Sequence, residues 1–148
     1  MDHLHGLSNH VFTYGTLRKG QGAYNRFGLD KACTFIKTTT IPGLMYSMGG
    51  YPGIKLGARD KPAPYNRTVY PLIVGDLFEI TDEYIVRRLD GYEGCDERNS
   101  DDGLYRRVLA MTTCGIETWI YEINGKQNPA RLIKSGNWLE PGRDKRYG

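Results

Sequence analysis

The chain has 148 residues, 39% of them hydrophobic and 25% charged, a composition typical of a globular domain that excludes a chain disordered throughout. Its formal net charge of +3 is too small to indicate a nucleic-acid partner by itself, and we expect none. No apolar run approaches the roughly 20 residues that a membrane helix needs, and the first ten residues lack the pattern of a signal peptide. We therefore expect no membrane association and a cytoplasmic location.

Two features of the composition favour a β-rich fold. The chain has 19 glycines without a repeat, which indicates many tight turns. It has 11 tyrosines against 4 phenylalanines, which indicates half-buried rings whose hydroxyls face water or a ligand. We expect one domain over residues 1–148, mostly strands with one or two helices, and a mobile terminus at residues 1–9.

Aromatic and β-branched residues predict the strands of the first half of the chain. A first strand at 10–15 is followed by a glycine-rich polar loop with one helical turn near 24–27. Pro71 predicts an edge position for the first part of the last strand of this half, and Gly75 predicts a bulge or a close backbone approach. The other expected strands lie at 32–41, 44–48, 53–57 and 69–80, with turns at Pro42-Gly43 and 49–53 and a surface loop at 58–68.

The second half of the chain begins with the strongest helix signal, at residues 82–92. Thr81 or Asp82 can cap its first turn, and Gly91 marks its end. Two strands at 104–113 and 116–123 are joined as a hairpin, and the tail beyond Asn124-Gly125 shows little regular pattern. The apolar face of the helix consists of Ile85, Val86, Leu89 and Tyr92.

The segment at the end of the first strand is a candidate anion site. Its residues are Tyr14, Gly15, Thr16 and Leu17. A glycine there lets the backbone turn sharply and lets a ligand approach closely. Successive exposed amides in such a turn can bind a carboxylate or an oxyanion, although a simple strand-to-loop turn explains the same residues.

Glu93 is a candidate general base, because it falls just beyond the predicted helix, between an aromatic residue and a glycine. The negative end of the helix dipole raises the pKa of a carboxyl group, and partial burial raises it further. Both effects bring a glutamate toward the pKa of a useful base. The alternative interpretation is a solvated surface acid.

Other kinds of site are not indicated. The three histidines, His3, His5 and His10, all lie in the first ten residues, at or beside the expected mobile terminus, so we expect no metal. The cysteines, Cys33, Cys95 and Cys114, form no CxxC pair and have no histidine nearby in sequence. There is neither a GxSxG elbow nor a phosphate-binding GxxxxGK[ST] loop.

A series of short strings carries a resemblance that covers most of the chain. They are HVFTYGTLRKGQ at 10–21, GLMY at 43–46, YPG at 51–53, VGDLFEI at 74–80, LDGYEG at 89–94, LYRRV at 104–108, WIYEI at 119–123 and SGNW at 135–138. In order and spacing they resemble the γ-glutamylcyclotransferase-like (AIG2-like) family, whose most specific marks are YGTL and the glutamate of LDGYEG. The GTLRKGQ run and EGC at 93–95 look most like its γ-glutamylamine cyclotransferase branch.

The resemblance implies an α+β fold, a small mixed β-barrel with a few helices. It implies an anion-binding cavity at the YGTL turn, a small-molecule γ-glutamyl substrate, and neither cofactor nor metal. The polar loop at 95–103 and the basic C-terminus depart from the family, so the leaving group and oligomeric state stay open. The residues that the resemblance assigns are Glu93 for catalysis and Tyr14, Gly15, Thr16, Leu17, Asn25, Tyr105 and Tyr121 for substrate binding.

Under this resemblance, we hypothesise that Glu93 takes a proton from the substrate's α-ammonium group. The freed amine attacks the γ-carbonyl carbon, and the products are 5-oxoproline and a free amine. A first alternative is a non-catalytic member of the same fold that binds a small acidic metabolite. A second is an interaction module that uses Arg143, Lys145 and Arg146 of the basic tail.

Overall fold

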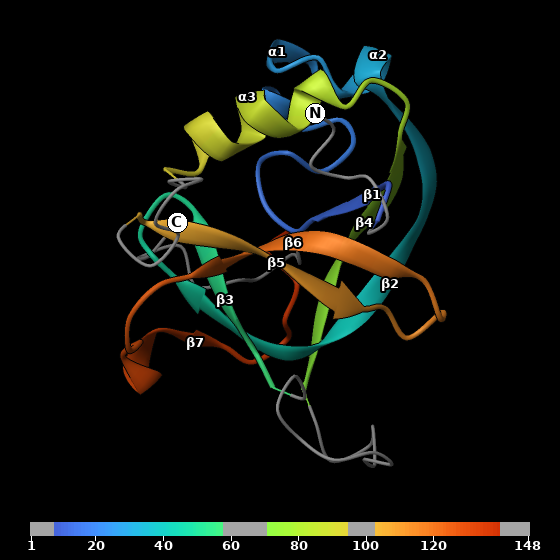
Figure 1. Cartoon of the computed structure of the whole chain (residues 1–148). Coiled ribbons are helices and arrows are strands. Elements are labelled where there is room, and N and C mark those ends of the chain that lie inside the picture. The colour runs from blue at the N-terminus through green and yellow to red at the C-terminus, as the bar shows by residue number, and fades with distance from the viewer. Residues whose placement is uncertain (1–7, 58–70, 95–102, 140–148) are drawn as a thin grey trace.

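The computed structural model describes residues 8–57, 71–94 and 103–139 (Figure 1). Its strands follow the order β3-β2-β4-β1-β6-β5, and β7 pairs with β2. The pairs are antiparallel apart from β1 and β6, which run parallel. The strands are β1 His10–Thr13, β2 Cys33–Ser47, β3 Pro52–Leu56, β4 Leu72–Ile80, β5 Tyr105–Met111, β6 Glu117–Ile123 and β7 Leu132–Ile133.

The sheet nearly closes into a barrel because β3 approaches β6 (Figure 1). The Lys55 ammonium group of β3 donates a hydrogen bond to the carbonyl of Ile123 in β6 (2.6 Å), and the Leu56 amide donates to the Glu122 carboxylate (2.9 Å). Gly53 permits this approach, since a Cβ there would lie 2.8 Å from Ile123 Cδ1. The expected α+β fold with a small mixed barrel is confirmed.

Strand β2 corrects the prediction of two strands separated by a turn at Pro42-Gly43. Both residues lie inside one strand of 15 residues, where Pro42 is opposite Leu72 and the Gly43 amide donates to the Pro71 carbonyl (2.9 Å). The strand pairs with β4 over most of its length and with β3 and β7 toward its end. Gly43 allows close packing, because a Cβ there would lie 2.6 Å from the Ile73 side chain.

Strand β4 lies between β2 and β1, but β1 pairs only with its residues 76–79. The first part of the strand, residues 72–75, has β2 as its only strand partner among the described residues, in agreement with the edge position predicted from Pro71. Pro71 lies one residue before the strand begins, where its missing amide interrupts no ladder hydrogen bond. Gly75 marks a close backbone approach, since an added Cβ would clash with the carbonyl oxygen of Thr13. The irregularity of register lies in β2, between Phe35 and Lys37.

Three helices gather at one end of the barrel (Figure 1). Helix α3 confirms the helix predicted at 82–92, and the Tyr84 amide donates to the Asp82 carboxylate at its start (3.1 Å). Gly91 lies inside this helix, whereas Gly94 beyond its end adopts the left-handed conformation (φ 67°). The helices are α1 Gly22–Arg26, α2 Leu29–Ala32 and α3 Tyr84–Tyr92, and a 3₁₀ turn, η1, spans Pro129–Arg131 in the tail.

Strand β1 lies between two hydrophobic cores, because successive side chains of a strand point to opposite faces. Val11 belongs to the cluster that contains Leu89 of α3. Phe12 belongs to the cluster that contains Ile54 of β3 and Ile120 of β6. The carboxyl end of β1 is therefore held from both sides, which fixes the start of the YGTL turn.

Ser8 and Asn9 are held in the fold, in contrast to the mobile terminus expected over residues 1–9. The Ser8 carbonyl accepts a hydrogen bond from the Trp119 indole (2.9 Å), and the Asn9 carbonyl accepts one from the Ile80 amide (2.7 Å).

Within the described ranges, no helix is long and apolar enough to cross a membrane. Outside the described residues lie His3, His5, Cys95, the loop expected at 58–68, and Arg143, Lys145 and Arg146.

Candidate active site

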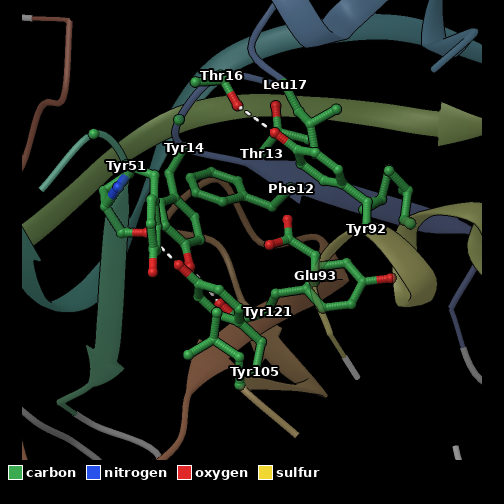
Figure 2. A pocket seen from close by; sticks show the side chains of 16 residues that line it. Phe12, Thr13, Tyr14, Thr16, Leu17, Tyr51, Tyr92, Glu93, Tyr105 and Tyr121 are labelled. Atoms are coloured by element: carbon green, nitrogen blue, oxygen red, sulfur yellow. Dashed lines mark hydrogen bonds between the residues drawn. The ribbon is translucent and has the colours of Figure 1, made fainter. Parts of the chain in front are cut away.

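A cavity of about 390 Å³ opens where β1 ends, beside the end of α3 and the β5–β6 hairpin (Figure 2). Seven of the eight residues expected at the site line it, namely Glu93 and all the expected substrate-binding residues other than Asn25. Sequence segments more than 100 residues apart thus converge here. The lining residues are Val11, Phe12, Thr13, Tyr14, Gly15, Thr16, Leu17, Gly50, Tyr51, Pro52, Leu89, Tyr92, Glu93, Leu104, Tyr105 and Tyr121.

The four residues of the YGTL turn line this cavity. The carbonyls of Gly15 and Thr16 accept hydrogen bonds from the amides of Arg18 (3.1 Å) and Ala23 (3.2 Å). Over the described ranges, the amides of Gly15, Thr16 and Leu17 donate to no backbone carbonyl. They remain available for an anion or an oxyanion.

Gly15 is required for close packing rather than for an unusual backbone angle, because its φ is not positive. A Cβ at this position would lie 2.9 Å from both the Cγ and the Cδ of Pro52. A larger residue would push the turn away from β3 and change the direction of its amides.

A buried ion pair anchors the chain directly after the turn. Arg18 donates to the Asp76 carboxylate (3.2 Å) and to the side-chain oxygen of Asn137 (3.0 Å). Asp76, only 3% exposed, also accepts from the Lys19 amide (2.9 Å) and the Thr38 hydroxyl (2.8 Å). The motifs GTLRK, VGDLFEI and SGNW therefore meet in one network, which fixes the turn against β2 and β4.

Glu93 directly follows α3, and its carboxylate points into the cavity among the tyrosines (Figure 2). Enclosure by protein atoms raises its pKa to about 8, and the negative charge of Asp90 contributes to this rise. Solvent reaches the side chain only in part. Glu93 is thus mostly protonated at pH 7, with a pKa close enough to neutral pH for a general acid/base to take up and release a proton.

Three tyrosine hydroxyls at the cavity already donate their protons to the protein. Tyr14 donates to the Tyr121 carbonyl (2.5 Å), and Tyr105 donates to the Pro52 carbonyl (2.6 Å). Tyr121 donates to the Asp90 carboxylate (2.6 Å). Burial is the main cause that raises the pKa of each of these hydroxyls, so they stay neutral. A hydroxyl whose proton is engaged offers a ligand only its lone pairs, which accept hydrogen bonds.

The opposite wall joins the turn to α3. The hydroxyls of Thr16 and Tyr92 lie 3.1 Å apart in a hydrogen bond (Figure 2). The Tyr92 ring packs on Phe27, with ring centroids 4.3 Å apart. This contact couples the position of the turn to the helix end that carries Glu93.

The rim of the cavity is apolar. Its most exposed large side chains are Tyr51 (40% exposed), Tyr92 (40%) and Leu104 (49%). Among the described lining residues there is no lysine, arginine or histidine, and Glu93 is the sole carboxylate.

Asn25 is not brought to the cavity. It lies in α1, and its side chain is exposed, since the short helix turns Ala23 rather than Asn25 toward the core. Sequence reasoning missed two acids next to the site, Asp76 and Asp90. Asp76 holds the chain after the YGTL turn, and Asp90 accepts a hydrogen bond from Tyr121. For Asp76 the available signal was an acid inside the apolar strand 72–80.

The described residues of the cavity offer neither a cysteine nucleophile nor a set of metal ligands. Cys33 is buried in the core, where its pKa is raised to about 12 by burial, and Cys114 is exposed at the β5–β6 turn. Neither cysteine lines the cavity. Among the described residues, no group of three or more His, Cys, Asp or Glu side chains is placed to hold a metal ion.

Comparison with known proteins identifies the family of this chain. The model of the family described as "Gamma-glutamyl cyclotransferase, AIG2-like" matches residues 11–140. The chain is 30% identical over 130 residues to the gamma-glutamylcyclotransferase family protein ytfP of Citrobacter rodentium, an alignment that covers 88% of this chain and 95% of that protein.

Two solved structures share the fold. The solution NMR structure of ytfP from Escherichia coli is 26% identical with a TM-score of 0.58, covering 88% of this chain and 96% of that chain. The crystal structure of PH0828 from Pyrococcus horikoshii is 23% identical with a TM-score of 0.60, covering 88% and 90%. The family match spans most of the chain, including the YGTL turn and Glu93. The chain therefore belongs to the γ-glutamylcyclotransferase, AIG2-like family.

Proposed function

We propose that this protein is a cyclotransferase that cleaves a γ-glutamyl amide and releases 5-oxoproline and a free amine, with Glu93 as the general acid/base. Family membership supports a cyclotransferase-type enzyme acting on a small molecule. The observation that supports the residue assignment is that Glu93 lines the same cavity as residues 15–17, whose amides donate to no backbone carbonyl within the described ranges.

The first step is a proton transfer. The α-ammonium group of a γ-glutamyl compound has a pKa of about 8 in water and is a poor nucleophile while protonated. The pKa of Glu93 is raised to about 8, so the two groups are matched and the transfer costs little free energy. The oxygens of Tyr14, Tyr105 and Tyr121 are suited to hold the ammonium group beside Glu93, because each can accept a hydrogen bond.

Ring closure follows within the substrate. The freed α-nitrogen attacks the γ-carbonyl carbon, a C–N bond forms, and the carbonyl oxygen becomes an oxyanion near the amides of the YGTL turn. Loss of one such donor typically costs roughly 3–4 kcal/mol in the barrier. Glu93 then gives its proton to the leaving nitrogen, the bond from that nitrogen to carbon breaks, and the carbonyl re-forms. The ring nitrogen still carries two hydrogens, and its second proton passes through the ionised Glu93 to the released amine, which leaves as an ammonium ion. Since the attack is intramolecular, the cavity's main task is to hold the substrate folded.

The apolar rim supports the γ-glutamylamine branch over γ-glutamyl amino acids. With the glutamyl group at residues 15–17 and Glu93, the leaving group extends toward Tyr51, Tyr92 and Leu104. The described rim provides contact area for an apolar amine and no cation for a second carboxylate. A leaving group with a free carboxylate would also lie close to the negative charge of ionised Glu93.

The test asks whether oxygen from water enters the product and whether cleavage needs a free α-amine. The purified protein is incubated in ¹⁸O-labelled water with a γ-glutamyl amide and with its N-acetyl analogue, and products are identified by mass spectrometry. The proposal requires unlabelled 5-oxoproline from the first compound and no cleavage of the second. Labelled glutamate would indicate hydrolysis and refute the proposed reaction. Binding of the amide without any product would favour the non-catalytic alternative.

A further inference from the structure

Helix α3 ends with two acids one turn apart that face different partners. Glu93 lines the cavity, whereas Asp90 is only 6% exposed and lies outside the lining. The proposed reaction uses Glu93 alone, so the buried carboxylate of Asp90 needs a separate explanation. Buried acids are uncommon unless they are paired or hydrogen-bonded.

The partners of Asp90 all come from the β5–β6 hairpin. Arg107 donates to its two carboxylate oxygens from Nε (3.0 Å) and Nη2 (3.3 Å), and the Tyr121 hydroxyl donates to Oδ1 (2.6 Å). Arg107 and Tyr121 are directly opposite each other in the β5–β6 ladder. The Arg107 guanidinium also lies 4.5 Å above the Trp119 ring, so its position is fixed from a second side.

We propose that Asp90 is a positioning residue for Glu93, which ties the end of α3 to the β5–β6 hairpin and places a second negative charge one helical turn from the catalytic carboxylate. This inference rests on the proposed function of Glu93. Tyr121 takes part in both sites, since its ring lines the cavity while its hydroxyl holds Asp90. A substitution at Asp90 should therefore alter both the position of Tyr121 in the cavity wall and the charge near Glu93.

The charges around Glu93 determine in which direction each substitution should move its pKa. Asp90 is the charged neighbour that raises the pKa of Glu93, and Arg107 offsets part of the Asp90 charge through its two hydrogen bonds. Glu122 is turned toward Arg106 and the Leu56 amide. Asp90 is the acid that acts on Glu93 from α3. The other titratable groups at the cavity are tyrosines, namely Tyr92 from α3, Tyr14 from the turn, Tyr51 from the loop before β3, Tyr105 from β5 and Tyr121 from β6.

Two substitutions should therefore move the titration of Glu93 in opposite directions. Asp90→Asn keeps an acceptor for Tyr121 and removes the negative charge, so Glu93 should lose its proton at a pH lower by about one unit, the order expected for two charges one turn apart. Arg107→Gln leaves Asp90 without its counter-charge, so the midpoint should rise. Arg107→Lys restores the charge without the paired geometry and should return the midpoint toward that of the wild type.

The experiment measures Glu93 directly by ¹³C NMR of its carboxyl carbon, with Asp82→Asn as the matched control. This control removes the same charge from the exposed start of the same helix and should leave the midpoint unchanged. The acid limb of kcat/KM, measured in parallel, should follow the NMR midpoint. About tenfold higher relative activity is expected for Asp90→Asn well below the midpoint.

An unchanged NMR midpoint in Asp90→Asn, or shifts of the same sign in Asp90→Asn and Arg107→Gln, would overturn the proposal. If Asp90→Asn fails to fold, the Arg107→Gln and Arg107→Lys pair still decides the direction. The NMR titration needs no substrate, so it reports on Asp90 even when no turnover is found. Absence of turnover in the wild type would instead refute the proposed function.

Discussion

Replacing Glu93 by glutamine is expected to stabilise the folded protein at alkaline pH. The pKa of Glu93 is raised from 4.5 to about 8 in the folded state, mainly by burial. Below pH 4.5 the carboxyl group is protonated in both states and costs nothing. Between pH 4.5 and 8 the unfolded chain releases this proton while the folded chain retains it, so stability falls as the pH rises.

The magnitude follows from the size of the shift. One pKa unit corresponds to 1.36 kcal/mol, so the full shift amounts to roughly 5 kcal/mol of unfolding free energy, an upper value for a side chain that solvent partly reaches. Glutamine fits the same space without a charge. The variant should therefore match the wild type near pH 4.5 and exceed its unfolding free energy by several kcal/mol, on the order of 2–5, near pH 9.

The assay is urea unfolding of both proteins at pH 5, 7 and 9. Glu117→Gln, at an exposed position on β6, serves as the control for loss of one negative charge. An advantage of the Glu93→Gln variant that stays constant with pH, or that Glu117→Gln reproduces, would refute the reasoning. In that case Glu93 would be an ordinary solvated acid.

Four further predictions concern residues that line the cavity. Gly15→Ala should raise KM and lower the unfolding free energy by about 1–3 kcal/mol, because its Cβ would lie 2.9 Å from Pro52; unaltered kinetics would remove the turn from the site. Tyr51→Ala should lower kcat/KM about tenfold for γ-glutamyl-phenethylamine and leave the γ-glutamyl methylamide unaffected, because apolar contact is lost at the rim. The wild type should also prefer the phenethylamide to γ-glutamyl-phenylalanine, which differs only by a carboxylate, and equal rates would contradict an apolar rim as the selector. Thr13→Val should raise the unfolding free energy by about 1 kcal/mol in chemical denaturation, since the buried Thr13 hydroxyl has no partner within the described ranges; a loss of stability would point to a missed hydrogen bond.

The sequence predicts the parts of the site that depend on local chemistry. The glycine after the first strand and the acid after the helix are visible as short patterns, and the family resemblance joins them. The apolar period of 82–92 predicts α3, and hence the position of Glu93 just beyond it. The structure adds the reason for the raised pKa of Glu93, which is burial first and then the negative charge of Asp90.

The parts that could not be predicted depend on contacts between distant segments. Asp76 meets Arg18 across 58 residues, and Arg107 meets Asp90 across 17, so no local pattern pairs them. The continuity of β2 through Pro42 is likewise decided by its partner strand, which overrides the local preference of Pro-Gly for a turn. Asn25 was placed by alignment to a motif alone, and the short helix α1 leaves it exposed.

The measurement that tests the central claim most directly is 5-oxoproline release by the wild type and by Glu93→Gln. Both proteins are incubated with γ-glutamyl-phenethylamine and, in parallel, with γ-glutamyl-ε-lysine and γ-glutamyl-alanine, and the product is quantified by mass spectrometry. The wild type should release 5-oxoproline from at least one compound, and Glu93→Gln should lose nearly all turnover while keeping its fold. Wild-type turnover by Glu93→Gln would contradict the assignment of Glu93 as the acid/base.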